Sequence, residues 1–255
     1  MLLFGLYQYS VREVNMFGIK DLIVFLILFG ANLLQAITGF AGTLISMPPT
    51  IKLIGADEAK ALLNSIAQIS SLMIVCTGFK HINWKEFGKI FVCMIIGMTA
   101  GVWIYSHFPL KQLLVAYGIM IIVIALKKLI SKNQNEKQLP QWFMICILLA
   151  AGVIHGMFVS GGALLVVYAT LVLKDKEEFR ATVALIWVTT GFYITIPQAL
   201  TGGFNSHVLS LLIVGVIPVF AGTFIGTKMV KKISQNVFMN ITYILLLLSG
   251  IMAIV

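Results

Sequence analysis

The sequence predicts an all-α polytopic membrane protein: two inverted repeats of five hydrophobic segments, each with a glycine-tipped broken helix or hairpin, giving eight to ten transmembrane helices. Hydrophobic residues make up 60% of the 255 positions and charged residues only 11%, whereas soluble domains carry roughly 25% charged residues. A helix needs about 20 mostly apolar residues to cross a bilayer, and such runs recur along the whole chain. The expected solvent is therefore the membrane.

Hydropathy and helix-breaking residues divide the chain into two sets of five apolar segments. The first set is expected at residues 20–38, 43–54, 59–79, 84–106 and 110–130. The second set is expected at residues 140–159, 161–173, 179–200, 205–226 and 235–255. The domain organisation that follows is an N-terminal extension (1–19), a first transmembrane repeat (20–130), a polar cytoplasmic linker (131–139) and a second transmembrane repeat (140–255).

A shift of 120 residues brings the two sets into register, which indicates an internal duplication. Residues 41–45 then fall on residues 161–165, and residues 58–61 fall on residues 178–181. Because five segments is an odd number, the second half should enter the membrane from the opposite side. Inverted repeats of this kind are common in transporters.

The distribution of lysine and arginine supports a topology in which residues 20–54 enter and leave the membrane on one side. Thirteen of the 18 Lys and Arg residues then collect on one face, and the other face keeps Arg12, Lys20, Lys52, Lys60 and Lys111. Cytoplasmic loops carry such an excess of positive charge. Both termini are therefore predicted outside, in a bacterial or archaeal inner membrane.

The segments 43–54 and 161–173 are too short to cross comfortably, so we interpret each as the return arm of a hairpin whose tip stops inside the bilayer. The tips are residues 38–43 and 158–162. Glycine lets the backbone approach a ligand closely, and the first amides of a helix, at the positive end of its dipole, suit an anion. The alternative is close helix packing, since small residues line membrane helix interfaces.

Uncharged polar residues lie deep in the predicted helices and should face each other or a cavity, because unsatisfied polar groups are costly in hydrocarbon. Asn32, Gln35 and Thr38 share roughly one helical face. His155 aligns with Gln35 in the repeat, and histidine titrates near neutral pH, which would allow proton coupling. The substrate-binding candidates are Asn32, Gln35, Thr38, Gly39, Gly42, Thr43, Asn64, Gln68, His155, Ser160, Gly161, Gly162 and Thr189. Contact between helices is the alternative role for each of them taken singly.

Other function classes lack the residues that they need. All nine acidic residues lie at segment ends or in loops, which disfavours a cation carrier that uses an intramembrane carboxylate. No cluster of His, Asp or Glu suggests an enzyme or a metal site, and the three cysteines have no CxxC spacing. The basic residues are scattered over short connectors, unlike a nucleic-acid-binding surface. We therefore expect no catalytic residues, no cofactor and no nucleic-acid partner.

The pattern resembles the sulfite exporter TauE/SafE family of membrane transporters over nearly the whole chain, from about Asp21 to the end. The resemblance is carried by the glycine break followed by Pro48 and residues 55–61, and by residues 158–162 followed by residues 179–182. It implies transport of sulfite, sulfoacetate or other organosulfur anions, often outward. The usual tips are richer in glycine than these, which have Phe40 and Ala41 in one and Val159 and Ser160 in the other.

The expected function is a secondary transporter of small anions that works by alternating access, with the bilayer and the anion as partners and with a homodimer left open. A passive anion channel, or a carrier of another small solute such as a carboxylate or a metal ion, is the alternative.

Overall fold

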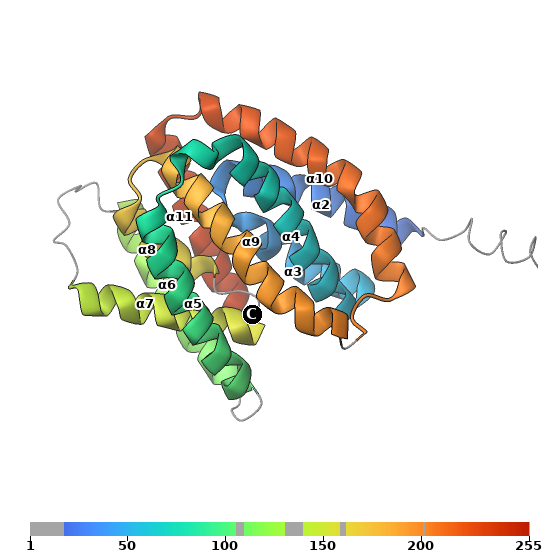
Figure 1. Cartoon of the computed structure of the whole chain (residues 1–255), viewed down its shortest axis with the longest axis horizontal. Coiled ribbons are helices and arrows are strands. Elements are labelled where there is room, and N and C mark those ends of the chain that lie inside the picture. The colour runs from blue at the N-terminus through green and yellow to red at the C-terminus, as the bar shows by residue number, and fades with distance from the viewer. Residues whose placement is uncertain (1–17, 106–109, 131–139, 159–161, 201, 255) are drawn as a thin grey trace, which may run out of the picture.

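The computed structural model describes residues 18–105, 110–130, 140–158, 162–200 and 202–254, and all regular structure in these ranges is helical (Figure 1). The predicted all-α class is confirmed. The helices of the first half are α2 (Ile19–Thr38), α3 (Ala41–Ile54), α4 (Ala56–Gly78), the 3-10 turn η1 (Phe79–His81), α5 (Trp84–Tyr105) and α6 (Leu110–Ile130). Those of the second half are α7 (Gln141–Phe158), α8 (Gly162–Val172), α9 (Lys176–Leu200), α10 (Ser206–Lys232) and α11 (Gln235–Ile254).

Four helices, α3, α4, α9 and α10, are at least two residues longer than their apolar segments suggested. α9 begins at Lys176 instead of 179, because the Asp175 carboxylate accepts the amides of Glu177 and Glu178 at 2.9 and 3.0 Å and so caps a polar first turn. α10 continues to Lys232 instead of 226, with Lys231 and Lys232 in its last turn. Cations are favourable there because the C-terminal end of a helix carries partial negative charge.

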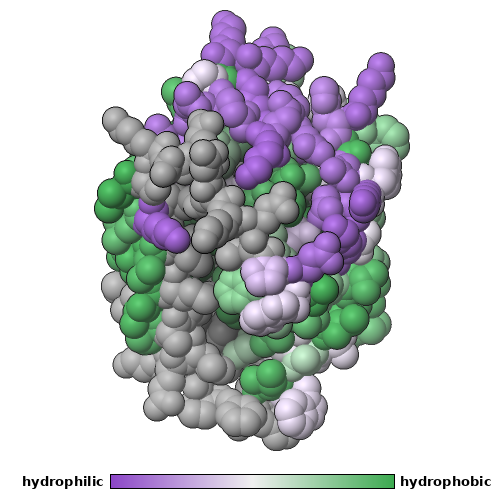
Figure 2. Space-filling model, turned by 90° about the vertical axis from the view of Figure 1, so that its left-hand side faces the viewer, coloured by the Kyte–Doolittle hydropathy of each residue, from purple (hydrophilic) through white to green (hydrophobic). Residues whose placement is uncertain are grey.

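Five helices of the described chain are long and apolar enough to cross a membrane: α2, α4, α5, α9 and α10. Their outer surfaces expose large hydrophobic side chains, such as Ile213, Ile217 and Phe224 on α10. Figure 2 shows hydrophobic side chains over the middle of one face of the molecule and hydrophilic ones gathered toward one end. Such a surface suits lipid around the middle and water at the ends.

The helices pack mainly in pairs that join the two halves of the chain. α2 lies along α10, α5 along α7, α4 along α9, and α6 along α11 (Figure 1). Glycines permit the backbones to touch: a Cβ at Gly101 on α5 would lie 2.1 Å from the carbonyl oxygen of Val153 on α7, and one at Gly222 on α10 would lie 2.5 Å from that of Phe29 on α2. This use of small residues is typical of helix interfaces in membranes.

The break between α2 and α3 turns the chain back toward its starting end. Gly39 ends α2 in the left-handed conformation with φ of 86°, and α3 then runs for 14 residues. At its end, Leu53 and Ile54 line the same cavity as Ile19 and Asp21 at the start of α2. α2 and α3 therefore form the predicted hairpin in the first half. The corresponding turn in the second half, residues 159–161, lies outside the described residues.

Candidate functional site

The tip of the first hairpin is a buried turn whose backbone amides are held by side chains of α2. Gln35 accepts the Gly42 amide through Oε1 at 3.0 Å. Thr38 accepts the Ala41 amide through Oγ1 at 3.3 Å. These two acceptors act as caps for the first turn of α3, whose amides have no partner within the helix.

The amides of Ala41 and Gly42, which were expected to be free donors, are therefore occupied in the conformation described. Gln35 and Thr38 were expected to line a cavity, but their oxygens reach the tip because both lie on the last turns of α2, directly before the break. Gly42 is required for this arrangement, since a Cβ there would lie 2.3 Å from Gln35 Oε1. The other end of the Gln35 amide donates through Nε2 to Ser71 Oγ on α4 at 3.0 Å, which fixes the orientation of the group.

Trp187 on α9 connects this tip to the second half of the chain. Its indole Nε1 donates to the Gly39 carbonyl at 2.8 Å. A Cβ on Gly162, the first residue of α8, would lie 3.4 Å from the same indole. The ring of His155 on α7 lies 5.3 Å away, centroid to centroid. Gly39, Gly162 and His155 thus surround one side chain, which brings described residues beside both predicted tips into one region.

His155 is buried, with 6% of its surface exposed. Its Nδ1 atom has no hydrogen-bond partner among the described residues. A buried imidazole with a vacant nitrogen beside an indole is able to accept or donate one further hydrogen bond. A solute or a proton could therefore engage Nδ1 without displacing a partner among the described residues.

A second polar group lies farther along the same face of α9, where Gly191 and Thr195 follow Trp187 at intervals of four residues. Asn64 on α4 donates through Nδ2 to Thr195 Oγ1 at 2.9 Å, and Gln68 donates through Nε2 to the same oxygen at 2.6 Å. A Cβ at Gly191 would lie 2.5 Å from Gln68 Cγ, so the glycine makes room for the glutamine. The predicted pair Asn64 and Gln68 therefore binds α9 across the interface of the two halves.

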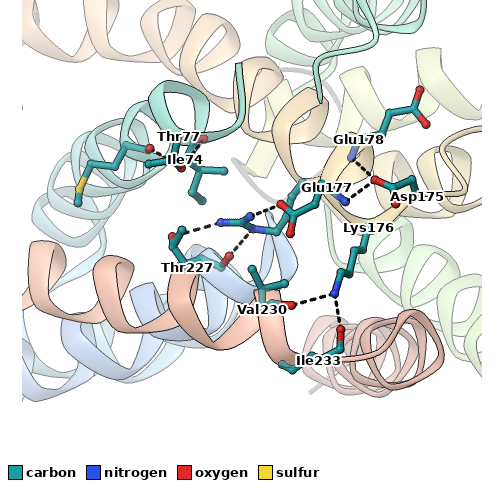
Figure 3. A network of polar contacts seen from close by, with 12 residues as sticks. Ile74, Thr77, Asp175, Lys176, Glu177, Glu178, Thr227, Val230 and Ile233 are labelled. Carbon is teal, nitrogen blue, oxygen red and sulfur yellow. Dashed lines mark hydrogen bonds and ion pairs between the residues drawn. The ribbon is translucent and has the colours of Figure 1, made fainter. Parts of the chain in front are cut away.

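Arg180 is a buried cation in contact with the tip. Its backbone packs on Gly39, and its guanidinium donates through Nε to the Ala36 carbonyl of α2. The other contacts of the guanidinium are with Glu177 Oε2 at 2.8 Å and Thr227 Oγ1 on α10 at 3.2 Å. Figure 3 shows Glu177 and Thr227 turned toward this centre, with α9 and α10 on its two sides. The guanidinium therefore fastens α9 to α2 and α10.

Near Arg180, hydrogen bonds join the start of α9 to the end of α10. Lys176 Nζ donates to the carbonyls of Val230 and Ile233 (Figure 3). The Gln235 side chain accepts the Lys176 amide at 3.0 Å and donates to the Lys174 carbonyl at 2.7 Å. The Lys176 ammonium thus binds carbonyls at the end of α10, where the last carbonyls of a helix lack partners within it.

Of the remaining predicted site residues that the structure describes, Asn32 and Thr189 form their hydrogen bonds within their own helices. Asn32 Nδ2 donates to the Leu28 carbonyl of its own helix at 2.7 Å. Thr189 donates to the Leu185 and Ile186 carbonyls of α9. Thr43 lies half-buried in the first turn of α3. Ser160 and Gly161 lie outside the described residues.

Sequence reasoning missed Trp187, Ser71 and Thr195, which make the contacts between elements. The spacing of Trp187, Gly191 and Thr195 would have placed them on one face of a helix. Nothing in the spacing identifies their partners, which lie more than a hundred residues away in the chain.

Comparisons with known proteins found a matching family model and a similar transporter protein. The model of the sulfite exporter TauE/SafE family matches residues 24–253. The chain is also similar to a probable inner membrane transporter protein, TsaS, of Comamonas testosteroni, with 23% identity over 175 residues that cover 68% of this chain and 73% of the relative. No solved structure matches the chain. Among the described residues, no group of three or more His, Cys, Asp or Glu could hold a metal ion.

Proposed function

Because the chain belongs to the sulfite exporter TauE/SafE family, we propose that it is a secondary transporter of small anions that works by alternating access, with sulfite, sulfoacetate and other organosulfur oxyanions as substrates. The observation that carries the proposal is the contact of Trp187 with Gly39, at the break in the first hairpin. The indole belongs to the second half and the break to the first. A movement of one half against the other must therefore change this contact.

Selectivity for anions is supported by the charges around the break. The N-terminus of α3 carries about half a positive charge, and Arg180 packs against Gly39. The described acidic residues lie at the starts of helices: Asp21 on α2, Asp57 and Glu58 on α4, Glu86 on α5, Asp175 before α9, and Glu177 and Glu178 on it. We expect an oxyanion to take the acceptor role that Gln35 Oε1 fills at the Gly42 amide.

An inverted repeat is supported by the helix pairs. A shift of about 120 residues relates α2 to α7 and α10 to α5, so the α2–α10 and α5–α7 pairs correspond, while α4 and α9 correspond to each other. Alternating access between two such halves moves one of them against the other around a site at their interface. In this topology both termini lie outside, and His155 beside Trp187 is the proton carrier of the site.

Transport by the purified protein in proteoliposomes tests the proposal. We expect saturable uptake and counterflow of labelled sulfite or sulfoacetate, and weaker transport in the Trp187→Phe variant, which keeps the ring but loses the indole N–H. The matched control is Trp142→Phe, because Trp142 is exposed at the start of α7.

Uptake of sulfite without saturation or counterflow would indicate a channel, and transport of carboxylates or nickel in preference to sulfur oxyanions would replace the substrate class. Equal transport by the Trp187→Phe and Trp142→Phe variants would show that the indole N–H of Trp187 does not contribute to transport. A His155→Gln variant whose flux keeps the pH dependence of the wild type would remove His155 as the proton carrier.

A further inference from the structure

Three helices begin around a cavity at the end of the molecule where α2 starts. The cavity has a volume of about 370 Å³ and is lined by Gly18, Ile19, Lys20, Asp21, Leu53, Ile54, Glu58 and His207. His207, in the first turn of α10, lies between carboxylates of two other helices. Its Nδ1 is 2.7 Å from Glu58 Oε2 on α4, and its Nε2 is 3.2 Å from Asp21 Oδ1 on α2.

Both contacts are hydrogen bonds only when the imidazole carries two protons. A neutral imidazole has one N–H and one lone pair, so one of its two nitrogens would present a lone pair to a carboxylate oxygen. Both carboxylates already act as acceptors on their other oxygens: Glu58 Oε1 accepts Asn205 Nδ2 at 2.7 Å, and Asp21 Oδ2 accepts the Gly18 amide at 2.8 Å. The arrangement therefore matches an imidazolium between two ionised carboxylates.

We infer that His207, Asp21 and Glu58 form a proton-binding site that locks α10 to α2 and α4 while the proton is bound and releases them when it leaves. Water can reach the site, because the side chain of His207 is 38% exposed. Among the described residues that line the cavity, the other charged group is Lys20, and the part of α3 that lines it consists of Leu53 and Ile54.

Deprotonation of His207 would affect the contacts between the two halves of the chain. α10 belongs to the second half of the chain, whereas α2 and α4 belong to the first. α2 carries Gln35 to the amides at the break, and Ser71 of α4 accepts a hydrogen bond from Gln35. Loss of one proton at His207 removes at least one of the two charge-assisted bonds that hold the halves together at this end. Such bonds are roughly twice as strong as neutral ones, so the packing of α10 on α2 becomes sensitive to pH. The inference concerns the fold and does not depend on the identity of the solute.

The first test is the thermal stability of the detergent-purified full chain between pH 5 and pH 9. Histidine titrates within this range. The lock is complete at the acid end, so the wild type should lose stability as the pH rises. His207→Gln should melt about 3–8 °C below the wild type at pH 6 and close to it at pH 9. His81→Gln is the matched control, because His81 is exposed in η1, and it should follow the wild-type profile.

A distance measurement keeps the inference testable if His207→Gln folds poorly. Spin labels at Leu22 on α2 and Leu209 on α10, both exposed, should report a narrow distance distribution at pH 6 and a broader one at pH 9 in the wild type. His207→Gln should give the broad distribution at both values. Equal pH profiles in the wild type and His207→Gln, or a distribution that does not respond to pH, would overturn the inference whatever the transport assays report.

Discussion

Each end of the molecule contains an asparagine that caps one helix and binds a glutamate in the first turn of another. Asn205 caps α10 and donates to Glu58, while Asn83 accepts the Glu86 amide at the start of α5 and donates to Glu178. Both Asn–Glu bonds measure 2.7 Å. Each pair joins the two halves, and a shift of 120 to 122 residues relates one pair to the other.

The surroundings of the two pairs differ in the group that can change its charge. Beside Glu58 lies His207, whose imidazole can change its charge by gaining or losing a proton. The position related to His207 by the shift that relates the asparagines is Lys85, an exposed lysine. The Asn83 end is instead fixed by Thr182, whose Oγ1 accepts the Asn83 amide at 3.0 Å. The same Asn–Glu arrangement therefore has a hydrogen-bonded histidine beside it at one end and a threonine beside it at the other.

The largest loss of stability is expected for substitutions of glycines at which helices of the two halves are in backbone contact. Gly101→Ala on α5 places a Cβ 2.1 Å from the Val153 carbonyl, and Gly222→Ala on α10 places one 2.5 Å from the Phe29 carbonyl. A backbone atom cannot rotate away, so the helices must separate, and we expect each variant to lose about 3 kcal/mol or more. The measurement is the yield of monodisperse protein and its melting temperature in detergent.

Two glycines with open surroundings serve as controls for these variants. A Cβ at Gly30 or Gly88 would meet no atom within 4 Å, so Gly30→Ala and Gly88→Ala should leave stability unchanged or raise it by up to about 1 kcal/mol. If the Gly222→Ala variant kept its stability while the Gly101→Ala variant lost it, the α2–α10 and α5–α7 interfaces would not be equivalent.

Hydropathy was sufficient to predict the helices and the hairpin of the first half, because burial in lipid acts on every residue of a segment. It was less reliable at the polar ends. The first turn of α9 and the last of α10 were missed, because a carboxylate cap at Asp175 and basic residues near the end of α10 extend helices beyond their apolar parts.

The sequence singled out residues at the break of the first hairpin but did not predict their contacts. The spacing of Gln35 and Thr38 places both on one face of α2, and it does not say whether their oxygens meet a cavity or cap the next helix. The break at Gly39 decides this, because it brings the amides of α3 within reach of both side chains. Trp187 was passed over as one apolar residue among many, since its hydrogen bond depends on how α9 packs against the break.

A smaller loss of stability is expected when Glu58 and Glu178 are each replaced by glutamine. Glu58→Gln weakens bonds to Asn205 and to the charged His207, whereas Glu178→Gln weakens one bond to Asn83. At pH 6 we expect losses of about 2 and about 1 kcal/mol respectively. The difference should shrink as the pH rises to 9, because loss of a proton from His207 removes at least one of its two bonds to carboxylates. Denaturant or thermal unfolding at the two pH values measures it, and a difference that persists unchanged at pH 9 would assign the extra loss to packing instead of charge.

The smallest effect is expected at the surface of the Asn83 end, where Lys89 pairs with Glu86 at 2.6 Å. The lysine side chain is 52% exposed, so water screens the pair and Lys89→Gln should cost no more than about 0.5 kcal/mol. Tyr168→Phe removes a buried bond to the other oxygen of Glu86, also 2.6 Å long, and should cost about 1 kcal/mol. Unfolding experiments at pH 6 and pH 9 measure both costs. If Lys89→Gln lost more stability than Tyr168→Phe, or if the loss in either variant changed with pH, the Asn83 end would respond to charge as the His207 end does. The contrast between the two ends would then be lost.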